Sequence, residues 1–366
     1  MQNRIGQRLG VLLTALPPAS AVEFAVKAEE RGFGSVWFPE ITFADAFGPA
    51  TAAALRTEVI AVGTGIVGIW SRSAVTAALE AVTLNELSGG RLILGLGTQA
   101  RGYVEEWHNQ KYRSPVAAMR EFVTIVKSIC AGEVTNYAGR IFSVKNFQLM
   151  TDVSEPKVRI FIAANGPRML QLAGEIADGV IGYFQSVEYV ENVVVPNVKL
   201  GAERASRSVS DVKITVGLPA VVTSDDSGID AAKGQVVMYA SATESSPSYI
   251  DSIAAAGFAD GAEEIRTRVA AGDVSGAFSV VSHEMADMLT LSGSPGHIWK
   301  RIEDYWKVGV DSIILTPTVP HGWYSLYEGH FPAGVEQPRF DYAAYLAVLE
   351  RTLELPRNLQ GSGPVD

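Results

Sequence analysis

The sequence predicts an α/β fold, namely a (β/α)8 TIM barrel with insertions. Eight short apolar runs alternate with segments in which apolar residues recur at helical spacing. The runs are nearly continuous in apolar residues, which is typical of parallel strands covered on both faces. The 366 residues would also suffice for two domains, but a single barrel domain spanning 1–366 accommodates all eight units.

A doubly wound open sheet is the alternative architecture. That fold usually carries a Gly-x-Gly-x-x-Gly loop directly after its first strand. Residues 13–20, which follow the first apolar run, contain no glycine. The sequence therefore favours the closed barrel.

Each unit of the predicted barrel is a strand followed by a helix. Apolar, often β-branched runs predict the strands, and apolar residues at helical spacing predict the helices. Gly32, Gly89 and Gly132 follow three of the helices, as helix ends commonly require. The predicted strands span 9–13, 35–38, 59–66, 91–96, 159–163, 179–183, 212–222 and 312–315. The predicted helices span 20–31, 46–55, 74–87, 115–131, 167–177, 187–205, 297–307 and 340–353.

Two segments near 133–158 and 223–295 interrupt this alternation and are interpreted as insertions. Alternating residues around a turn at Ala138-Gly139 indicate a hairpin or a covering loop over 134–150. The second segment is rich in Ala, Ser and Gly and has helical spacing. Pro196 is expected to kink or split the helix over 187–205, because proline cannot donate a helical hydrogen bond.

Composition excludes several classes of protein. The chain has 30 basic and 40 acidic residues, a formal net charge of −10, and no long basic cluster, so we expect no nucleic-acid partner. Its single cysteine, Cys130, cannot form an intrachain disulfide and lies in an apolar helical pattern typical of a core position. No Cys/His cluster has zinc spacing, so no metal is expected.

The sequence also lacks the signature of a membrane protein. No apolar run approaches the roughly 18 residues of a membrane-spanning helix. The run at 9–13, preceded by Arg4 and Arg8, weakly imitates a signal peptide, but we interpret it as the first core strand. We therefore expect a cytoplasmic protein without membrane contact.

In a barrel of this kind, chemistry is carried by residues at the carboxyl ends of the strands. Here those residues are rich in glycine and other small side chains, with no Gly-x-Ser-x-Gly elbow and no paired carboxylates. Small residues let a backbone approach a flat ligand closely. The pattern therefore favours a bulky bound cofactor over an acid/base hydrolase.

The turn at 165–168, Asn-Gly-Pro-Arg, is the clearest candidate for binding an anion. It lies directly before a predicted helix, whose free N–H groups and dipole favour a phosphate. Arg168 would add positive charge. An ordinary helix start with proline in its first position explains the same residues equally well.

Two polar side chains elsewhere are candidates, and each also has an ordinary structural role as its alternative. Glu40 follows the second strand and would make a polar contact at the mouth of the barrel, or would be a solvated loop acid. His108 lies in the loop after the fourth strand and would shuttle a proton, or would make a structural loop contact.

Four segments together resemble the luciferase-like monooxygenase superfamily, especially its coenzyme F420-dependent oxidoreductases. The segments are 63–67, 87–97, 104–108 and 163–180. The Ser-Gly-Gly-Arg…Gly-Leu-Gly run at 88–97 marks the superfamily. The Asn-Gly-Pro and Ala-Asp-Gly runs at 165–167 and 177–179 resemble the methylenetetrahydromethanopterin reductase branch, which uses coenzyme F420.

The resemblance implies a bacterial luciferase-like (β/α)8 barrel, with the cofactor ring toward the barrel mouth. Relatives have a bulge with a non-proline cis peptide in the third strand, behind the ring, which would fall at Gly65–Ile66 here. The implied cofactor-binding residues are Glu40, Thr64, Gly65, Ile66, Gly97, Thr98, Gln99, Ala163, Ala164, Asn165, Gly166, Pro167 and Arg168. Basic residues at 101, 111, 113 and 168 (Arg101, Lys111, Arg113 and Arg168) would offset negative charge near an anionic cofactor tail.

The sequence departs from the family at one position. Relatives often carry an acid followed by histidine after the second strand, whereas this chain has Glu40 followed by Ile41. A histidine acting as proton donor is therefore missing from that place. Glu40, Gln99 and His108 are the candidate catalytic residues that remain.

The leading hypothesis is an oxidoreductase that transfers a hydride between coenzyme F420 and a small organic substrate, working as a homodimer. The cofactor would supply the chemistry, and the protein would supply orientation and electrostatics. The second hypothesis is an FMN-dependent luciferase-like monooxygenase that uses O2. The third is a non-catalytic flavin-binding barrel.

Overall fold

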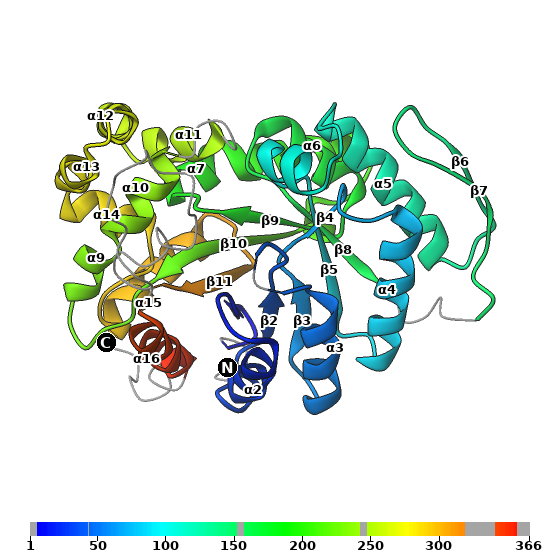
Figure 1. Ribbon diagram of the computed structural model, residues 1–366, viewed down its shortest axis with the longest axis horizontal. Coiled ribbons are helices and arrows are strands. Elements are labelled where there is room, and N and C mark those ends of the chain that lie inside the picture. Colours follow the sequence, from blue (N-terminus) through cyan, green and yellow to red (C-terminus); the bar gives the residue numbers. More distant parts are fainter. Residues whose placement is uncertain (1–5, 43, 152–156, 242–246, 319–340, 357–366) are drawn as a thin grey trace. The chain divides into compact units, whose positions relative to one another are not determined.

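A computed structural model describes residues 6–42, 44–151, 157–241, 247–318 and 341–356 of the chain (Figure 1). The chain divides into two compact units. One, here called the N-terminal unit, comprises Leu12–Ile181 and Pro196–Ile214. The other, here called the C-terminal unit, comprises Met1–Val11, Gly182–Val195 and Thr215–Asp366.

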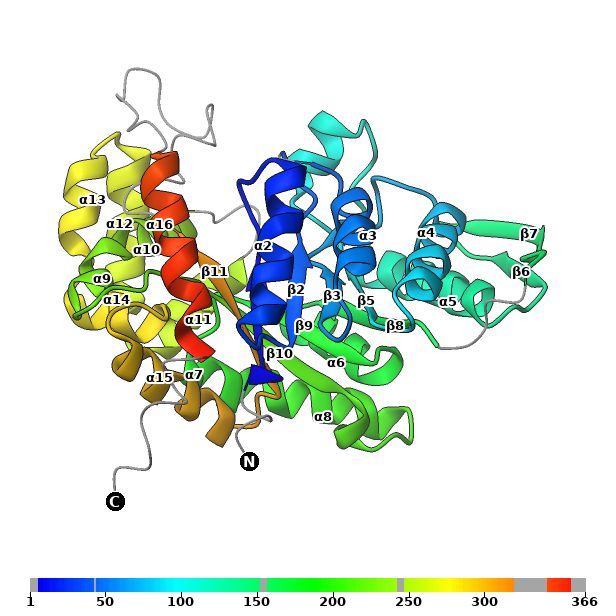
Figure 2. The same ribbon diagram turned by 90° about the horizontal axis from the view of Figure 1, so that it is seen from below.

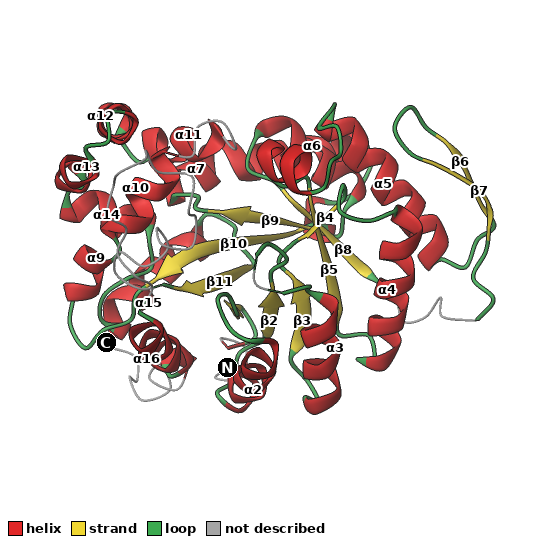
Figure 3. Ribbon diagram, in the orientation of Figure 1, coloured by secondary structure: helices red, strands yellow, loops and turns green. Residues whose placement is uncertain are grey.

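The N-terminal unit is built on parallel strands, drawn in yellow in Figure 3. Strand β3 pairs with β2 and with β5, β8 pairs with β5 and β9, and the short β4 also pairs with β5. All six residues of β5 are buried, as expected for a strand covered on both faces. The strands are β2 (Ser35–Phe38), β3 (Ala61–Thr64), β4 (Val67–Gly68), β5 (Leu92–Gly97), β8 (Arg159–Ala163) and β9 (Gly179–Tyr183).

The predicted third strand over 59–66 is wrong in its bounds. Pairing begins only at Ala61, because the N–H groups of Val59 and Ile60 donate to the Glu29 carboxylate instead of a neighbouring strand. The strand also stops at Thr64, and a cis peptide bond joins Gly65 to Ile66, which confirms that prediction. Strand β4 then resumes beside β5, with Gly68 opposite Gly97.

Helices cover the sheet of the N-terminal unit. Figure 2 shows α2, α3 and α4 side by side, and these helices contact one another in that order along the chain. Ser73 caps α4 by accepting a hydrogen bond from the Thr76 N–H at 3.0 Å. The helices are α2 (Pro18–Glu30), α3 (Phe47–Arg56), α4 (Ala74–Leu87), α5 (Pro115–Cys130), α6 (Pro167–Ile176) and α8 (Val195–Arg204). Two short turns are η1 (Tyr103–Trp107) and η3 (Val209–Asp211).

The insertion near 133–158 contains an antiparallel hairpin, which is one of the two alternatives predicted for this segment. Its strands are β6 (Thr135–Ala138) and β7 (Ser143–Phe147), which lie beside α5 in Figure 1. The Glu121 carboxylate on α5 accepts hydrogen bonds from the N–H groups of residues 140, 141 and 142 in the hairpin turn. One buried carboxylate therefore ties the hairpin to the helix.

The C-terminal unit contains three further parallel strands. They are β1 (Leu9–Leu12), β10 (Lys213–Ala220) and β11 (Ser312–Pro317), with β11 between the other two. Leu9 is fully buried and pairs with Ile313, so the run at 9–13 is a core strand as predicted.

The described part of the segment over 223–295 in the C-terminal unit, residues 223–241 and 247–295, is largely helical, as predicted. Phe184 and the buried faces of these helices form a hydrophobic core, in which Phe184 stacks on Tyr239 with ring centroids 4.5 Å apart. The helices are α9 (Ser227–Ala231), α10 (Lys233–Ser241), α11 (Pro247–Ala255), α12 (Ala259–Ala270), α13 (Val274–Val280) and α14 (His283–Leu289).

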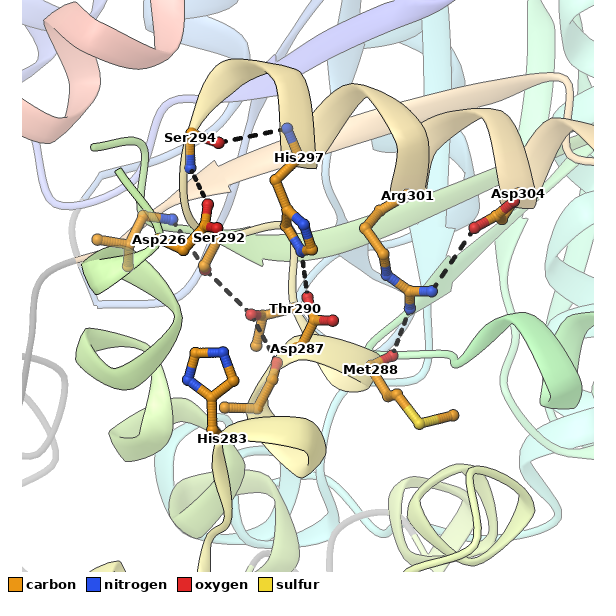
Figure 4. Close-up of polar contacts among 12 residues, drawn as sticks. Asp226, His283, Asp287, Met288, Thr290, Ser292, Ser294, His297, Arg301 and Asp304 are labelled. Carbon is orange, nitrogen blue, oxygen red and sulfur yellow. Dashed lines mark hydrogen bonds and ion pairs between the residues drawn. The ribbon is translucent and has the colours of Figure 1, made fainter. Parts of the chain in front are cut away.

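A polar junction joins α14 to α15 (Pro295–Lys307) in the C-terminal unit (Figure 4). His297 Nε2 lies 2.5 Å from Asp287 Oδ1, and Arg301 donates to the carbonyl of Met288 at 3.0 Å. The Ser294 hydroxyl caps α15. These contacts fix the angle between two helices that a five-residue turn connects.

The predicted helix over 187–205 is helical without a break over 187–204, and its geometry is perturbed by a π-helical turn just before Pro196. The described segments are α7 (Val187–Tyr189), the π-helical turn η2 (Val190–Val194) and α8, in which Pro196 is the second residue. The wider turn before Pro196 accommodates the missing N–H donor. Helix α16 (Tyr342–Leu353) is the last element described.

Within the described residues, eight parallel strands, with β4 as a short continuation of β3, alternate with helices in chain order. This confirms the predicted fold class, a (β/α)8 barrel with insertions. The organisation as one domain over 1–366 stays a prediction.

Candidate active site

The predicted site residues lie at the carboxyl ends of neighbouring strands in the N-terminal unit. Because β2, β3, β5 and β8 pair in parallel, their carboxyl ends share one edge of the sheet (Figure 3). Glu40 follows β2, residues 64–66 follow or end β3, residues 97–99 end β5, and residues 163–168 join β8 to α6. The fold thus brings four separate sequence segments to one edge.

Thr64 serves the sheet itself. Its hydroxyl donates to the carbonyl of Gly95 at 2.9 Å and accepts from the Gly95 N–H at 2.9 Å. The side chain is fully buried. The hydroxyl therefore bridges β3 and β5 just before the cis peptide bond, where the regular ladder stops.

The glycines of this edge make room for the protein's own side chains. A Cβ on Gly97 would lie 2.4 Å from Cδ1 of Ile66, and a Cβ on Gly63 would lie 2.3 Å from Cε3 of Trp37. Real Cβ contacts do not become this short, so neither position accepts a larger residue without rearrangement. The glycines therefore allow Ile66 and Trp37 to pack tightly at the strand ends.

Gln99 is placed in an unusual way. Its φ of 56° lies in the left-handed region, and its amide packs over Gly68, where a Cβ would lie 2.2 Å from Oε1. Within the described residues, the buried Oε1 has no hydrogen-bond partner, and the same holds for the buried indole Nε1 of Trp70. Buried polar groups in proteins are nearly always paired, so each of these two groups has a hydrogen bond to make that the described residues do not supply.

Glu40 is held by three donors. Arg72 Nη2 donates to Oε2 at 2.7 Å, the Ala46 N–H donates to Oε2 at 3.4 Å, and the Ser71 hydroxyl donates to Oε1 at 3.3 Å. The side chains of Glu40 and Arg72 are only 14% and 13% exposed. An ion pair this sheltered favours a carboxylate that accepts hydrogen bonds.

Glu80 on α4 is the second acid near Arg72. Its Oε2 lies 3.1 Å from Arg72 Nε. Burial raises the pKa of Glu80, and the negative charges of Glu40 and Asp45 raise it further, while Arg72 opposes the rise. One guanidinium thus serves two carboxylates that repel each other.

His108 lies apart from this cluster, at the end of η1. The residue is half-buried, and its backbone N–H donates to the carbonyl of Tyr103 at 3.3 Å. Trp107 beside it is 46% exposed and stacks on Tyr103, with ring centroids 4.1 Å apart. The structure gives His108 a loop position and no polar contact with Glu40 or Gln99.

The predicted basic residues of the same loop are on the surface. Arg101, Lys111 and Arg113 are exposed, and Arg101 pairs with Glu105 at 3.2 Å. Tyr112 donates its hydroxyl to Thr98 Oγ1 at 3.4 Å, which links the loop to the end of β5. The Thr98 side chain is therefore half-buried under the loop rather than exposed.

The turn from β8 to α6 has the geometry of a helix start. Ala163 ends β8 and is half-buried, and Ala164 is buried, with its N–H donating to the carbonyl of Ile181 at 3.0 Å. Gly166 is the N-cap residue and Pro167 is the first helical residue, with no side chain capping the helix. Asn165 and Gly166 are half-buried, whereas Pro167 and Arg168 are exposed. The geometry fits both the anion site and the ordinary helix start.

Sequence reasoning missed Trp70, Ser71 and Arg72. These residues follow the interrupted third strand, at the same edge as Glu40. The signal was present: an indole and a guanidinium directly after an apolar run. The prediction of one continuous strand ending at Ile66 directed attention to residues 63–66 instead.

Other kinds of site find no support in the described residues. In that part of the chain, no group of three or more His, Cys, Asp or Glu side chains is arranged to hold a metal ion. None of its helices combines the length and apolar character needed to cross a bilayer. An open depression of about 240 Å³ between α2 and α3 is lined by residues such as Pro18, Val22 and Ala52, and none of the predicted site residues contributes to it.

Comparison with known proteins gives the family. The family model described as luciferase-like monooxygenase matches residues 4–312. Because the match covers most of the chain, the protein belongs to the luciferase-like monooxygenase family, a family of enzymes with the (β/α)8 barrel fold.

Individual relatives fall within the branch expected from the sequence. The chain is 27% identical over 338 residues to a Mycobacterium tuberculosis protein whose name describes a coenzyme F420-dependent oxidoreductase, a match covering 85% of this chain and 95% of the relative. It is 29% identical over 297 residues to 5,10-methylenetetrahydromethanopterin reductase of Archaeoglobus fulgidus, covering 80% and 88%.

A solved structure agrees with the fold. The coenzyme F420-dependent tetrahydromethanopterin reductase from Methanopyrus kandleri matches with a TM-score of 0.75 and 24% identity, covering 84% of this chain and 92% of that chain. This similarity supports the barrel architecture independently of the strand pairings described above.

Proposed function

We propose that this protein is a coenzyme F420-dependent oxidoreductase that transfers a hydride between the deazaflavin and a small organic substrate. Membership of the luciferase-like monooxygenase family and the names of the relatives support this class of reaction. The observation that carries the proposal is the pair of buried, unpartnered groups among the described residues, Gln99 Oε1 and Trp70 Nε1. A pyrimidine ring edge carries both N–H donors and carbonyl acceptors, so it would satisfy both groups.

The residues at the strand ends would hold the cofactor in distinct ways. Gln99 would accept from a ring N–H, Trp70 would donate to a ring carbonyl, and the Glu40 carboxylate would accept a further hydrogen bond. Ile66, packed on Gly97, would present an apolar surface behind the ring. When bound, the deazaflavin supplies the hydride chemistry, and the protein orients the two reactants.

The turn at 163–168 would bind the phosphate side of the cofactor. Gly166 leaves the first N–H groups of α6 without a side-chain cap, and Arg168 is exposed beside them. Pro167 has no N–H, and the N–H groups of Met169 and Leu170 donate to the Gly166 carbonyl at 3.1 Å, so the helix dipole and the nearby guanidinium are what would favour an anion. Homodimer assembly and a cytoplasmic location stay predictions.

An FMN-dependent monooxygenase using O2 is the second candidate. The family description favours it. Ile41 stands where relatives often carry a histidine, and its hydrocarbon side chain has no proton to donate. His108 is the alternative donor, from its half-buried loop position.

A binding titration separates the candidates. The purified full chain is titrated with F420 and with FMN while fluorescence quenching is measured. We expect saturable F420 binding and weak FMN binding, and a Gln99→Ala variant that binds F420 about ten-fold more weakly because one buried hydrogen bond is lost. Gln110→Ala, which removes an exposed amide from the neighbouring loop, should leave the dissociation constant unchanged.

Each outcome has a definite meaning. Tight FMN binding without F420 binding would replace the proposal with the monooxygenase. Binding of neither compound would leave the non-catalytic barrel and reject both enzymes. Equal effects of the two glutamine substitutions would reject the role given to Gln99.

A further inference from the structure

Arg72 occupies the space between two carboxylates at the candidate site. Its Nη2 donates to Glu40 Oε2 at 2.7 Å, while its Nε lies 3.1 Å from Glu80 Oε2. Glu40 follows β2, Glu80 is on α4, and Arg72 lies in the segment between β4 and α4. One side chain thus connects a strand end to a helix through two ion pairs.

The guanidinium is fixed from a third direction. Its central carbon lies 5.2 Å from the ring centroid of Phe47, the first residue of α3. The Arg72 side chain is only 13% exposed, which makes it far more sheltered than surface arginines such as Arg56, at 47%. A planar guanidinium can face both acids at once, whereas a single ammonium cannot bridge both acids with the same geometry. Among the described residues, Arg72 Nη1 has no hydrogen-bond partner, and the contact with Glu80 Oε2 is an ion pair without a hydrogen bond.

Glu40 keeps acceptor capacity despite these contacts. Among the described residues, Oε2 receives Arg72 and the Ala46 N–H, but Oε1 receives only the Ser71 hydroxyl, at 3.3 Å. The single proton of that hydroxyl is shared with the Gly68 carbonyl at 3.0 Å. An ionised carboxylate oxygen accepts about two hydrogen bonds. Oε1 therefore has room for one more donor, and its orientation is set by the ion pair at the other oxygen.

We propose that Arg72 is a positioning residue, which holds the Glu40 carboxylate in the orientation that binds the cofactor, with Glu80 as the anchor of the guanidinium. This inference rests on the function proposed above, because Glu40 acts on the cofactor ring. In this role Arg72 acts through Glu40.

A double-mutant cycle on cofactor affinity tests this. Dissociation constants for F420 are measured for the wild type, Glu40→Gln, Arg72→Gln and the variant with both substitutions. We expect each single substitution to weaken binding about ten-fold. Glu40→Gln removes the charged acceptor, and Arg72→Gln leaves that acceptor without a fixed orientation. In the Glu40→Gln background, Arg72→Gln should change the constant less than about two-fold, since the group that Arg72 positions is already gone.

Two further variants distinguish positioning from folding. Arg72→Lys keeps the charge and should recover part of the affinity, and Glu80→Gln should weaken binding less than Arg72→Gln does. Arg56→Gln breaks the exposed Arg56–Glu23 pair between α3 and α2 and should leave the dissociation constant unchanged. Thermal unfolding of every variant reports stability separately, and Glu80→Gln carries the test if Arg72→Gln does not fold.

The outcomes separate this proposal from the proposed function. If Arg72→Gln or Glu80→Gln weakens binding equally with and without Glu40, Arg72 acts independently of Glu40 and the inference is overturned. A Glu40→Gln variant with unchanged affinity overturns it as well. If the wild type binds FMN and not F420, the proposed function fails while the same cycle with FMN still tests Arg72. Binding of neither compound rejects both.

Discussion

Replacing Glu121 by glutamine should loosen the hairpin that lies against α5. In the wild type, Oε2 accepts from the N–H groups of Ile141 and Phe142 at 2.9 and 2.8 Å, and Oε1 accepts from the Arg140 N–H at 3.0 Å. The side chain is 9% exposed, so solvent cannot readily replace these bonds. The turn therefore depends on one acceptor group.

The size of the destabilisation follows from the hydrogen bonds that the Glu121→Gln substitution changes. The glutamine oxygen still accepts two N–H groups, without the benefit of charge, while its NH2 group faces the Arg140 N–H, donor against donor. Two charge-assisted bonds become neutral, at about 1 kcal/mol each, and one buried donor loses its partner, at about 1–3 kcal/mol. The smaller desolvation cost of an amide offsets part of this sum. We expect a net loss of about 2–3 kcal/mol in the free energy of opening the hairpin.

The pH dependence of the hairpin's stability gives a second, independent test. Burial alone would raise the pKa of Glu121, but the three backbone donors and the Arg140 charge lower it. A carboxyl with a lowered pKa stabilises the folded state fully above its unfolded pKa, and this contribution is lost as the pH falls through the folded value. The difference between wild type and Glu121→Gln should therefore be largest near neutral pH and shrink in acid.

Hydrogen exchange of the backbone amides measures this directly. The N–H groups of residues 140–142 should exchange faster in Glu121→Gln by about 30–150-fold at neutral pH, the factor that corresponds to 2–3 kcal/mol. Glu133→Gln is the matched control, because Glu133 is exposed and accepts only from the Ser128 hydroxyl at 2.9 Å. Equal exchange in wild type and Glu121→Gln, or a difference that persists undiminished in acid, would refute the reasoning.

Three other outcomes can be checked. Gly68→Ala should displace the Gln99 amide, since the new Cβ would lie 2.2 Å from Oε1, and should weaken F420 binding about ten-fold in a fluorescence titration. Asp287→Asn should lower the free energy of unfolding, measured in urea, by about 1 kcal/mol, because it weakens the 2.5 Å contact with His297. The effect is modest because both side chains of this pair are about a quarter exposed to solvent. Burial raises the pKa of Cys130 to about 12, so the native thiol should not react with Ellman's reagent at neutral pH and should react once the chain is denatured. An unchanged affinity, an unchanged urea midpoint or a reactive native thiol would contradict the respective argument.

The sequence predicted the strands well because buried parallel strands have a simple sequence pattern. The runs at 35–38, 159–163 and 179–183 coincide with the observed strands, as each is a short apolar segment between turn residues. The run at 59–66 misled because its composition stays apolar through the interruption after Thr64. No local property of residues 65 and 66 predicts a cis bond. That prediction came from resemblance to a family, and the structure confirms it.

The candidate site could be predicted only in part. Strand ends share an edge, so the positions of Glu40 and Gln99 followed from topology. The partner of Glu40 did not, because Arg72 is 32 residues further along the chain and two helices, α4 and α3, supply its other contacts. Side-chain pairing across such separations depends on the packing of α3 and α4, which hydrophobic periodicity does not specify.

The glycines at the strand ends determine which groups of the protein can contact a bound ring. From the sequence, the glycines at the strand ends were expected to let the backbone approach a flat ligand closely. In the structure, Trp37 and Ile66 fill the space beside Gly63 and Gly97. These positions therefore control the shape of the surface behind a ring, and side-chain groups must supply the polar contacts. Larger residues at Gly63 or Gly97 would act first on packing and stability, whereas substitutions at Gln99 would act first on binding. Stability and affinity measured side by side on Gly97→Ala and Gln99→Ala would separate the two roles, because only the second variant should lose affinity without a matching loss of stability.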